Sequence, residues 1–437
     1  MKSKEDIFPA SPDAQVKPSR RDFIKKTSMT ALTALAAPAL LTKYARASER
    51  PIKIGVVLPK TGVLAAFTEP EEFVYNGVQK IFANGVTING MNHPVEFIRK
   101  DSQSSSDRAA EVAAELINSD HVDLMLAAHT ADTCIPVSDQ CEINGVPCCT
   151  CDDPVDSWFF GRSGDLEKGF QWTYHFFWDN DQLAAVYMGI WNEQPTNKTV
   201  GVLYPDDSDG IATVKAFPPL LRLGGYNIVD PGRFTMLTTD YSRQIAKFKA
   251  ANAEICTGVL PTPPFSVFWQ QAAEQGYKPK ICTIAKADLF PAGIKALGSR
   301  GLGQTTEVWW SPMHPFKSSL TGQTAAEFAE DWETQTGKEW TQPMGFEHAL
   351  YEMAWNVLNR SKSLDPGAIR DALRTTDLET IVGPIQFAKK QKFPNVSLTP
   401  LVGGQWVHGK KWPYKLAIIF NGTYASIPKT ASLQSLA

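Results

Sequence analysis

Seven cysteines are the first residues whose types could support a metal centre, a redox site or a set of disulfides. Five of them lie between residues 134 and 151, but their spacing does not match that of a zinc finger. Cys148 and Cys149 would point to opposite faces of a buried strand, because side chains alternate along a strand. The pattern favours packing, and we expect no metal and no cofactor. Metal or redox chemistry would be sought only where His129 meets Cys151.

Aromatic residues form a second group with the chemistry to bind a ligand. The segment from Trp172 to Trp178 reads Trp-Thr-Tyr-His-Phe-Phe-Trp, and a Trp309-Trp310 pair follows later. Aromatic rings stack on flat or apolar ligands, and indoles also bind cations and sugars. Most of these side chains should belong to the core. The remainder favour an aromatic or otherwise flat solute.

Catalytic and nucleic-acid-binding signals are missing from the sequence. With seven histidines and no G-x-S-x-G, H-E-x-x-H or phosphate-cradling loop, the chain is not expected to be an enzyme. The formal charge of −3 conceals an asymmetry, since residues 1–47 hold nine Lys/Arg against four Asp/Glu. The rest of the chain carries 34 basic and 42 acidic residues. An acidic body without a basic stripe argues against a nucleic-acid partner.

The N-terminal segment carries the most specific short motif. Ser19-Arg20-Arg21-Asp22-Phe23-Ile24-Lys25 precedes a mildly apolar run from Met29 to Leu41, and Ala45-Arg46-Ala47 offers a signal peptidase its small-x-small pattern. The apolar run is shorter than the roughly 20 residues of a membrane span. Residues 1–47 therefore predict a twin-arginine signal peptide cleaved near Ala47. The mature protein would begin near Ser48 in the periplasm, after passing the twin-arginine translocase.

The remaining chain alternates strand-like and helix-like segments. Residues 51–58 form a nearly continuous β-branched run that stops at Pro59, as a buried parallel strand does. Ser106 offers an N-cap to a helix with one apolar face. Strands separated by helices imply right-handed crossovers, and so an α/β fold of two doubly wound parallel-sheet lobes. The other expected elements are strands at 94–100, 122–128, 146–150, 199–204, 255–260 and 280–285, and helices at about 133–143 and from about Asp181.

Five short motifs occur in an order that resembles the type I periplasmic solute-binding proteins of the branched-chain amino-acid ABC transporter class, the Leu/Ile/Val-binding family. The resemblance runs from about Ile52 to about Trp406. It rests on the motifs' joint order and spacing. They are Pro59-Lys60-Thr61-Gly62, Lys100-Asp101-Ser102, Ser138-Asp139, Asp179-Asn180-Asp181-Gln182 and Thr380-Ile381-Val382-Gly383-Pro384-Ile385.

The resemblance implies two lobes joined by three crossovers that close on a solute by a hinge. Lobe 1 would take residues 48–175 and 310–385, and lobe 2 would take 176–309 and 386–437. The implied partners are a small-molecule solute and an inner-membrane ABC permease, with the protein acting as a monomer. A sensor domain that feeds a membrane receptor shares this fold and stays open as an alternative, as do an amino-acid-binding and a metal-binding periplasmic protein.

Two loops of lobe 1 would hold the ligand, if the family's arrangement is carried over. They are His129-Thr130-Ala131-Asp132 and Cys151-Asp152-Asp153, where the family binds a ligand carboxylate through hydroxyls and backbone N–H groups. Ala131 replaces an expected serine, which leaves Thr130 as the nearest hydroxyl. The two aspartates would repel an anion unless they are paired, cap a helix or form a hinge ion pair.

Across the cleft, the family's acidic ammonium-binding residue falls near Lys286, which has the opposite charge. Lys286 is either a ligand contact or a solvated loop lysine. Both departures argue against an amino-acid ligand, and together with the aromatic residues they leave an aromatic or other flat organic acid as the expected solute. Trp178 and Trp310 adjoin the expected crossovers, and Phe346 begins a helix that should face the cleft. The candidate ligand-binding residues are His129, Thr130, Ala131, Cys151, Asp152, Asp153, Trp178, Asp209, Lys286, Trp310 and Phe346.

Overall fold

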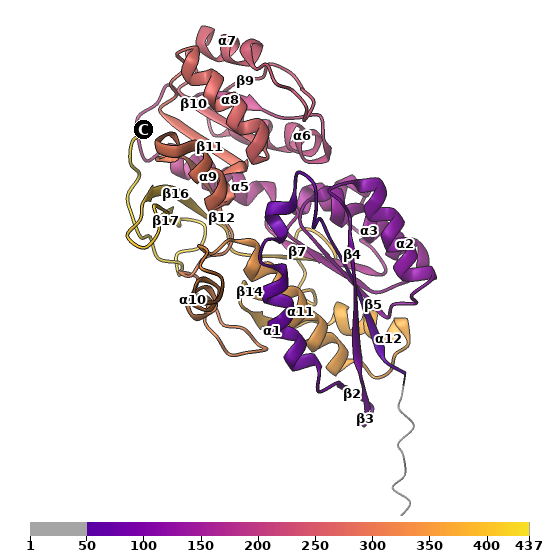
Figure 1. Cartoon of the computed structure of the whole chain (residues 1–437). Coiled ribbons are helices and arrows are strands. Elements are labelled where there is room, and N and C mark those ends of the chain that lie inside the picture. Colours follow the sequence, from indigo (N-terminus) through magenta and orange to yellow (C-terminus); the bar gives the residue numbers. More distant parts are fainter. Residues whose placement is uncertain (1–49, 437) are drawn as a thin grey trace, which may run out of the picture. The chain divides into compact units, whose positions relative to one another are not determined.

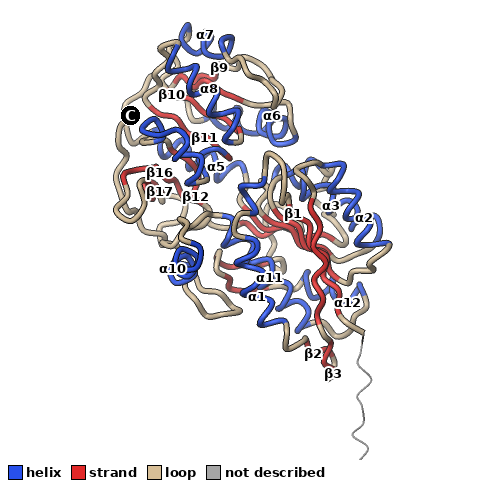
Figure 2. The backbone as a smooth tube through the Cα atoms, viewed as in Figure 1, coloured by secondary structure: helices blue, strands red, loops and turns tan. Residues whose placement is uncertain are grey.

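A computed structural model describes residues 50–436, which fold into two α/β lobes (Figure 1). The predicted twin-arginine motif and its cleavage site lie outside the described residues. No helix within residues 50–436 has the length and apolar character needed to cross a membrane. In each lobe helices flank a central sheet, shown in red in Figure 2.

The sheet of the first lobe is parallel throughout and has the order β15-β7-β6-β5-β1-β4. Helices α2 and α3 pack on one face of this sheet, and α1 and α11 pack on the other. Coverage of both faces explains why the strands read as continuous apolar runs. The strands are β1 (Ile52–Leu58), β4 (Val95–Asp101), β5 (Leu124–Ala128), β6 (Cys148–Cys151), β7 (Thr173–Phe177) and β15 (Val396–Leu398). The helices are α1 (Glu71–Phe82), α2 (Ser106–Asn118), α3 (Ala131–Asn144), α4 (Val155–Gly161), α10 (Ala325–Thr336), α11 (Pro343–Arg360) and α12 (Pro366–Arg374), with hairpins β2–β3 (Val86–Ile88, Met91–His93) and β13–β14 (Asp377–Thr380, Gly383–Gln386).

The sheet of the second lobe has the order β17-β16-β12-β11-β10-β8-β9, in which β16 alone runs antiparallel to its neighbours β12 and β17. Its inner strands are also covered on both faces. The strands are β8 (Thr199–Leu203), β9 (Asn227–Val229), β10 (Ile255–Leu260), β11 (Ile281–Lys286), β12 (Thr305–Val308), β16 (Val402–His408) and β17 (Tyr414–Phe420). The helices are α5 (Asn180–Trp191), α6 (Ser208–Leu223), α7 (Ser242–Ala250), α8 (Thr262–Glu274) and α9 (Pro291–Leu297).

The chain passes between the two sheets three times within the described residues: after β7, after β12 and after β15. The first passage enters α5, where Asp179 and Gln182 form a capping box. The boundary expected at residue 385 is wrong, because Val396 of β15 pairs with His175 of β7 in the first sheet. The one expected at residue 175 falls inside β7, which continues to Phe177.

The expected helix after the second strand forms with its apolar face buried, as at Val112 and Leu116. Its N-cap is Ser105, one residue before the predicted Ser106, and the Ser105 hydroxyl accepts a hydrogen bond from the Arg108 N–H.

All seven cysteines are buried as free thiols. Cys148 packs beneath α2 and α3, whereas Cys149 packs in the cluster on the opposite face, as alternation along a strand requires. No group of three or more metal-ligating side chains with metal-binding geometry occurs in residues 50–436.

Candidate ligand-binding site

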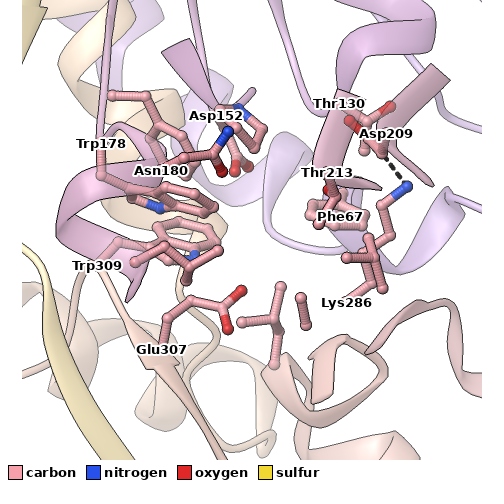
Figure 3. A pocket seen from close by; sticks show the side chains of 16 residues that line it. Phe67, Thr130, Asp152, Trp178, Asn180, Asp209, Thr213, Lys286, Glu307 and Trp309 are labelled. Atoms are coloured by element: carbon pink, nitrogen blue, oxygen red, sulfur yellow. Dashed lines mark ion pairs between the residues drawn. The ribbon is translucent and has the colours of Figure 1, made fainter. Parts of the chain in front are cut away.

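A cavity that is partly open to solvent lies between the two lobes (Figure 3). It is lined by the segments that follow β6, β7 and β12 and by the end of β11, so it sits where the carboxyl ends of the two sheets face each other. The first lobe lines it with Phe67, Thr130, Asp152, Pro154 and Phe177, and the crossing segments add Trp178, Asn180 and Trp309. The second lobe contributes Leu183, Asp209, Thr213, Val259, Ala285, Lys286, Leu289 and Glu307.

Three aromatic rings form one wall of the cavity. The Phe177 ring lies 4.9 Å from that of Trp178 and 5.4 Å from that of Trp309, centroid to centroid. Both indoles lie on the same side of the cavity in Figure 3. Trp178 is 4% exposed, and its Nε1–H has no hydrogen-bond partner among the described residues. Phe67 adds a fourth ring, in an edge contact with Phe290 at 4.9 Å. The wall offers flat apolar surfaces and one unused donor.

His129 anchors the polar part of the first lobe. Its Nδ1 lies 2.6 Å from Asp152 Oδ2 and its Nε2 lies 2.8 Å from Glu347 Oε1, with all three side chains buried. Burial by itself would lower the pKa of His129. The hydrogen bonds with Asp152 and Glu347 raise the pKa by more than burial lowers it, so the net pKa is about 9. Burial raises the pKa of Asp152 and brings that of Glu347 to about 7, with His129 opposing both shifts. The imidazolium therefore holds both buried carboxyl groups in place at neutral pH.

Lys286 plays the corresponding part in the second lobe. Its Nζ forms an ion pair with Asp209 and lies 3.9 Å from Asp207 Oδ2. Burial by itself would lower the pKa of Lys286. The neighbouring aspartates, chiefly Asp209, raise the pKa by more than burial lowers it, so the net pKa is above its ordinary value. Burial raises the pKa of Asp209 to about 6, although Lys286 opposes the shift. Lys286 is 7% exposed, which rules out a solvated loop lysine.

The backbone at these positions is strained. His129, Thr130, Asp152 and Lys286 have φ values of 73°, 69°, 59° and 66°, a region that side chains other than glycine seldom enter. Together they make up a third of the twelve such non-glycine residues in the described chain. Backbone strain of this kind concentrates at functional sites. The strained backbones therefore mark the loop ends around the cavity.

Glu307 is a further carboxyl group on the cavity wall. It is 2% exposed, and its Oε2 accepts hydrogen bonds from the Tyr187 hydroxyl at 2.5 Å and from Thr306 Oγ1 at 3.0 Å. Burial raises the pKa of Glu307 to about 7, although these hydroxyls lower it.

Five of the eleven predicted residues line the cavity: Thr130, Asp152, Trp178, Asp209 and Lys286. Five others lie behind its wall. His129 reaches the cavity through Asp152, Cys151 Sγ donates to the Phe346 carbonyl at 3.6 Å, and Ala131 begins α3. Phe346 packs on Trp309 at 5.1 Å, and Asp153 is fully buried, with no hydrogen bond to its carboxylate from a described residue.

Trp310 points away from the cavity, and Trp309 takes the place predicted for it. The Trp310 Nε1–H donates to the Ile381 carbonyl at 3.2 Å, and its ring contacts Phe328 and Trp340. Neither Asp152 nor Asp153 caps α4, whose N-cap is Pro154. The sequence analysis also missed Glu307, Phe67 and Asn180. Glu307 lies in β12, and Trp309 follows one residue beyond the end of that strand.

Comparisons with known proteins agree on one family. The family model described as periplasmic binding protein matches residues 51–402. The "Leu/Ile/Val-binding protein homolog 7" of Brucella suis is 24% identical over 399 residues, which cover 87% of this chain and 94% of the relative.

Solved structures show the same fold. A leucine-binding protein of Thermotoga maritima superposes with a TM-score of 0.70 at 19% identity, over 85% of this chain and 99% of the other. A solute-binding protein of an ABC transporter from Rhodopseudomonas palustris, in complex with 4-hydroxybenzoate, gives a TM-score of 0.68 at 16% identity, over 86% and 98%.

Proposed function

The chain belongs to the periplasmic binding protein family, and we propose that it is an exported protein that captures a flat aromatic acid between its lobes and delivers it to an inner-membrane ABC permease. The observation that carries the ligand class is the aromatic wall of Phe177, Trp178 and Trp309 in the cavity between the lobes. Planar rings bind such walls through stacking and burial of apolar surface.

Polar groups on the cavity wall suit the acid group of such a solute. The Thr130 hydroxyl and the Trp178 Nε1–H have no protein partner within residues 50–436, and Lys286 supplies positive charge. The Rhodopseudomonas palustris structures with 4-hydroxybenzoate and with 3,4-dihydroxybenzoic acid support this ligand class, because both proteins share the fold. Lys286 is positively charged and stands where the family has an acidic residue, and this charge supports an aromatic acid over an amino acid as the ligand.

Thermal unfolding against a ligand panel tests the proposal. We expect aromatic acids to raise the melting temperature by several degrees, because a ligand that binds only the folded state stabilises it by mass action. Leucine-like amino acids, sugars and dicarboxylates complete the panel. A rise with leucine-like amino acids alone would contradict the proposed ligand class.

Two neighbouring tryptophans provide a matched pair for this experiment. Trp309→Ala should weaken binding of the aromatic acid by about tenfold or more, since a stacking surface on the cavity wall is lost. Trp310→Ala should leave the affinity within about threefold while lowering stability, because that ring packs in the core. Equal losses of affinity in both variants would argue against the aromatic wall as the binding surface.

Export by the twin-arginine route is a separate part of the proposal. It rests on Ser19 to Lys25, the apolar run and the Ala45-Arg46-Ala47 triplet. Replacing Arg20 and Arg21 together by lysine should retain the protein in the cytoplasm, as measured by fractionation. Unchanged export would show that another route is used.

A further inference from the structure

Glu307 is the one carboxyl group lining the cavity that no cation balances among the described residues. Asp152 is paired with His129 and Asp209 with Lys286, both in buried ion pairs. Glu307 forms no ion pair within residues 50–436, although its side chain is as buried as theirs. A buried carboxylate without a counter-charge is costly, and burial accordingly raises the pKa of Glu307 to about 7. A donor that reached the carboxylate would offset that cost.

The orientation of Glu307 is fixed by hydroxyl groups on the side away from the cavity. Tyr187, buried on α5, and Thr306 both donate to Oε2. The backbone N–H of Glu307 also hydrogen-bonds to its own carboxyl group, but no other described residue donates to Oε1. Figure 3 shows the carboxyl group directed into the cavity below Trp309. One oxygen is held by the protein, and the other faces the space in which a solute would lie.

We infer that Glu307 binds a hydrogen-bond donor on the ring of the solute, a hydroxyl or an amino group, and thereby selects among flat solutes. The inference rests on the proposed function and deepens it, because the aromatic wall holds any planar ring, whereas Glu307 discriminates between substituents. A ring without a donor leaves Oε1 buried and unpaired once the cavity closes on it. Leaving a buried acceptor unsatisfied costs about 1–3 kcal/mol, which is about fivefold to 150-fold in affinity.

A competing interpretation makes Glu307 a structural partner of Tyr187 only. In that case the substituent on the ring would be irrelevant to binding. The two interpretations differ in what removal of the carboxyl group does to ligand preference, so preference among solutes, rather than affinity alone, is the quantity to measure.

The experiment titrates the purified protein by calorimetry with benzoate, 4-methoxybenzoate, 3- and 4-hydroxybenzoate and 4-aminobenzoate. The first two solutes lack a donor on the ring, and the others carry one. We expect a donor-bearing solute to bind the unsubstituted protein at least about tenfold more tightly than benzoate and 4-methoxybenzoate. In Glu307→Leu this preference should fall to within about threefold, with benzoate bound at least as tightly as before.

Matched variants separate recognition from folding. Glu339→Gln removes another buried carboxyl group, one that does not line the cavity, and should retain the preference. Glu307→Leu should fold, as monitored by circular dichroism, because replacing a buried unpaired carboxyl by an apolar group of similar size is often neutral or stabilising. Tyr187→Phe should weaken the preference partly, because Oε1 is then less well oriented.

Two results would overturn the inference alone. One is binding of all five solutes with no preference for donors, which leaves the proposed function intact. The other is a donor preference that persists in Glu307→Leu. Failure of every ring compound to bind the unsubstituted protein would refute the proposed ligand class, and the inference with it.

Discussion

Each lobe places a buried cation between two carboxylates at the cavity. In the first lobe His129 joins Asp152 and Glu347, and in the second Lys286 joins Asp209 and Asp207. Both cationic residues have a positive φ, so each loop is held in a strained conformation next to its ion pairs. The two arrangements share a charge pattern, but they differ in where their partners come from.

The His129 triad is complete within the first lobe. Both of its ring nitrogens have a carboxylate partner within 3 Å. Lys286 is also stabilised electrostatically by Asp132, and it lowers the pKa of Asp153, although both of these aspartates belong to the first lobe. These interactions across the cavity exist only while the lobes are together. The comparison indicates a fixed scaffold on one side and a group whose environment depends on closure on the other.

The largest effect is expected from His129→Leu. Removing the imidazolium leaves two buried carboxylates facing each other, which should cost about 3–5 kcal/mol of unfolding free energy, measured by urea denaturation. His348→Leu is the control. Burial lowers the pKa of His348 to about 3, and the ring makes one hydrogen bond, with Ser318. Its loss should cost about 1–3 kcal/mol. Equal costs would show that the triad is not an electrostatic anchor.

The pH dependence of stability should follow the same triad. The folded pKa of His129, about 9, exceeds its ordinary value of 6.5. The stabilisation is therefore fully present below about pH 6.5 and is lost as the pH rises through 9, by about 3 kcal/mol in all. The raised pKa of Glu347, about 7, extends the decline to lower pH, because ionising a buried acid destabilises the fold. Urea midpoints that stay constant or rise between pH 6.5 and 9 would contradict this, and His129→Gln should flatten the curve.

Lys286→Met tests the side that depends on closure. The variant leaves Asp209 and Asp207 without their cation, so the affinity for an aromatic acid should fall about tenfold, as measured by calorimetry. Lys295→Met serves as control, because Lys295 is 40% exposed at its side chain and its nearest carboxylate, on Glu339, is 3.9 Å away. An unchanged affinity in Lys286→Met would remove Lys286 from the binding site.

The smallest effect is expected from Asp153→Asn. Burial raises the pKa of Asp153 well above its ordinary range, which favours the neutral form of the side chain. An amide of the same shape should therefore change stability by less than about 1 kcal/mol. Asp152→Asn, one residue away, removes a carboxylate bound to His129 and should cost more. A large loss in Asp153→Asn would show that its carboxylate is ionised and holds the lobes together.

The fold was largely predictable from the sequence, because buried parallel strands leave continuous apolar runs. The run at 255–260 coincides with β10, and the opening run at 51–58 contains β1. The assignment of residues 386–398 to the second lobe failed, since pairing of β15 with β7 joins residues about 220 apart. No local pattern reports which sheet a three-residue strand will join.

The candidate site was predictable only in part. The resemblance located the loop ends, and Thr130, Asp152 and Lys286 do line the cavity. The prediction that Trp310, rather than Trp309, lines the cavity failed. Both residues lie beyond the end of β12, where the alternation of side chains along a strand no longer predicts which way each one points. The pairing of His129 with Glu347 spans 218 residues, and nothing local in the sequence indicates it.

The buried cysteines allow unfolding of each lobe to be measured by chemical labelling. Five thiols lie in the first lobe and two, Cys256 and Cys282, lie on neighbouring strands of the second, all without access to solvent in the folded state. An alkylating reagent can therefore modify them only as fast as each lobe unfolds. Mass spectrometry of the modified peptides would time the two lobes separately, and a bound solute should slow labelling of both if it clamps them together.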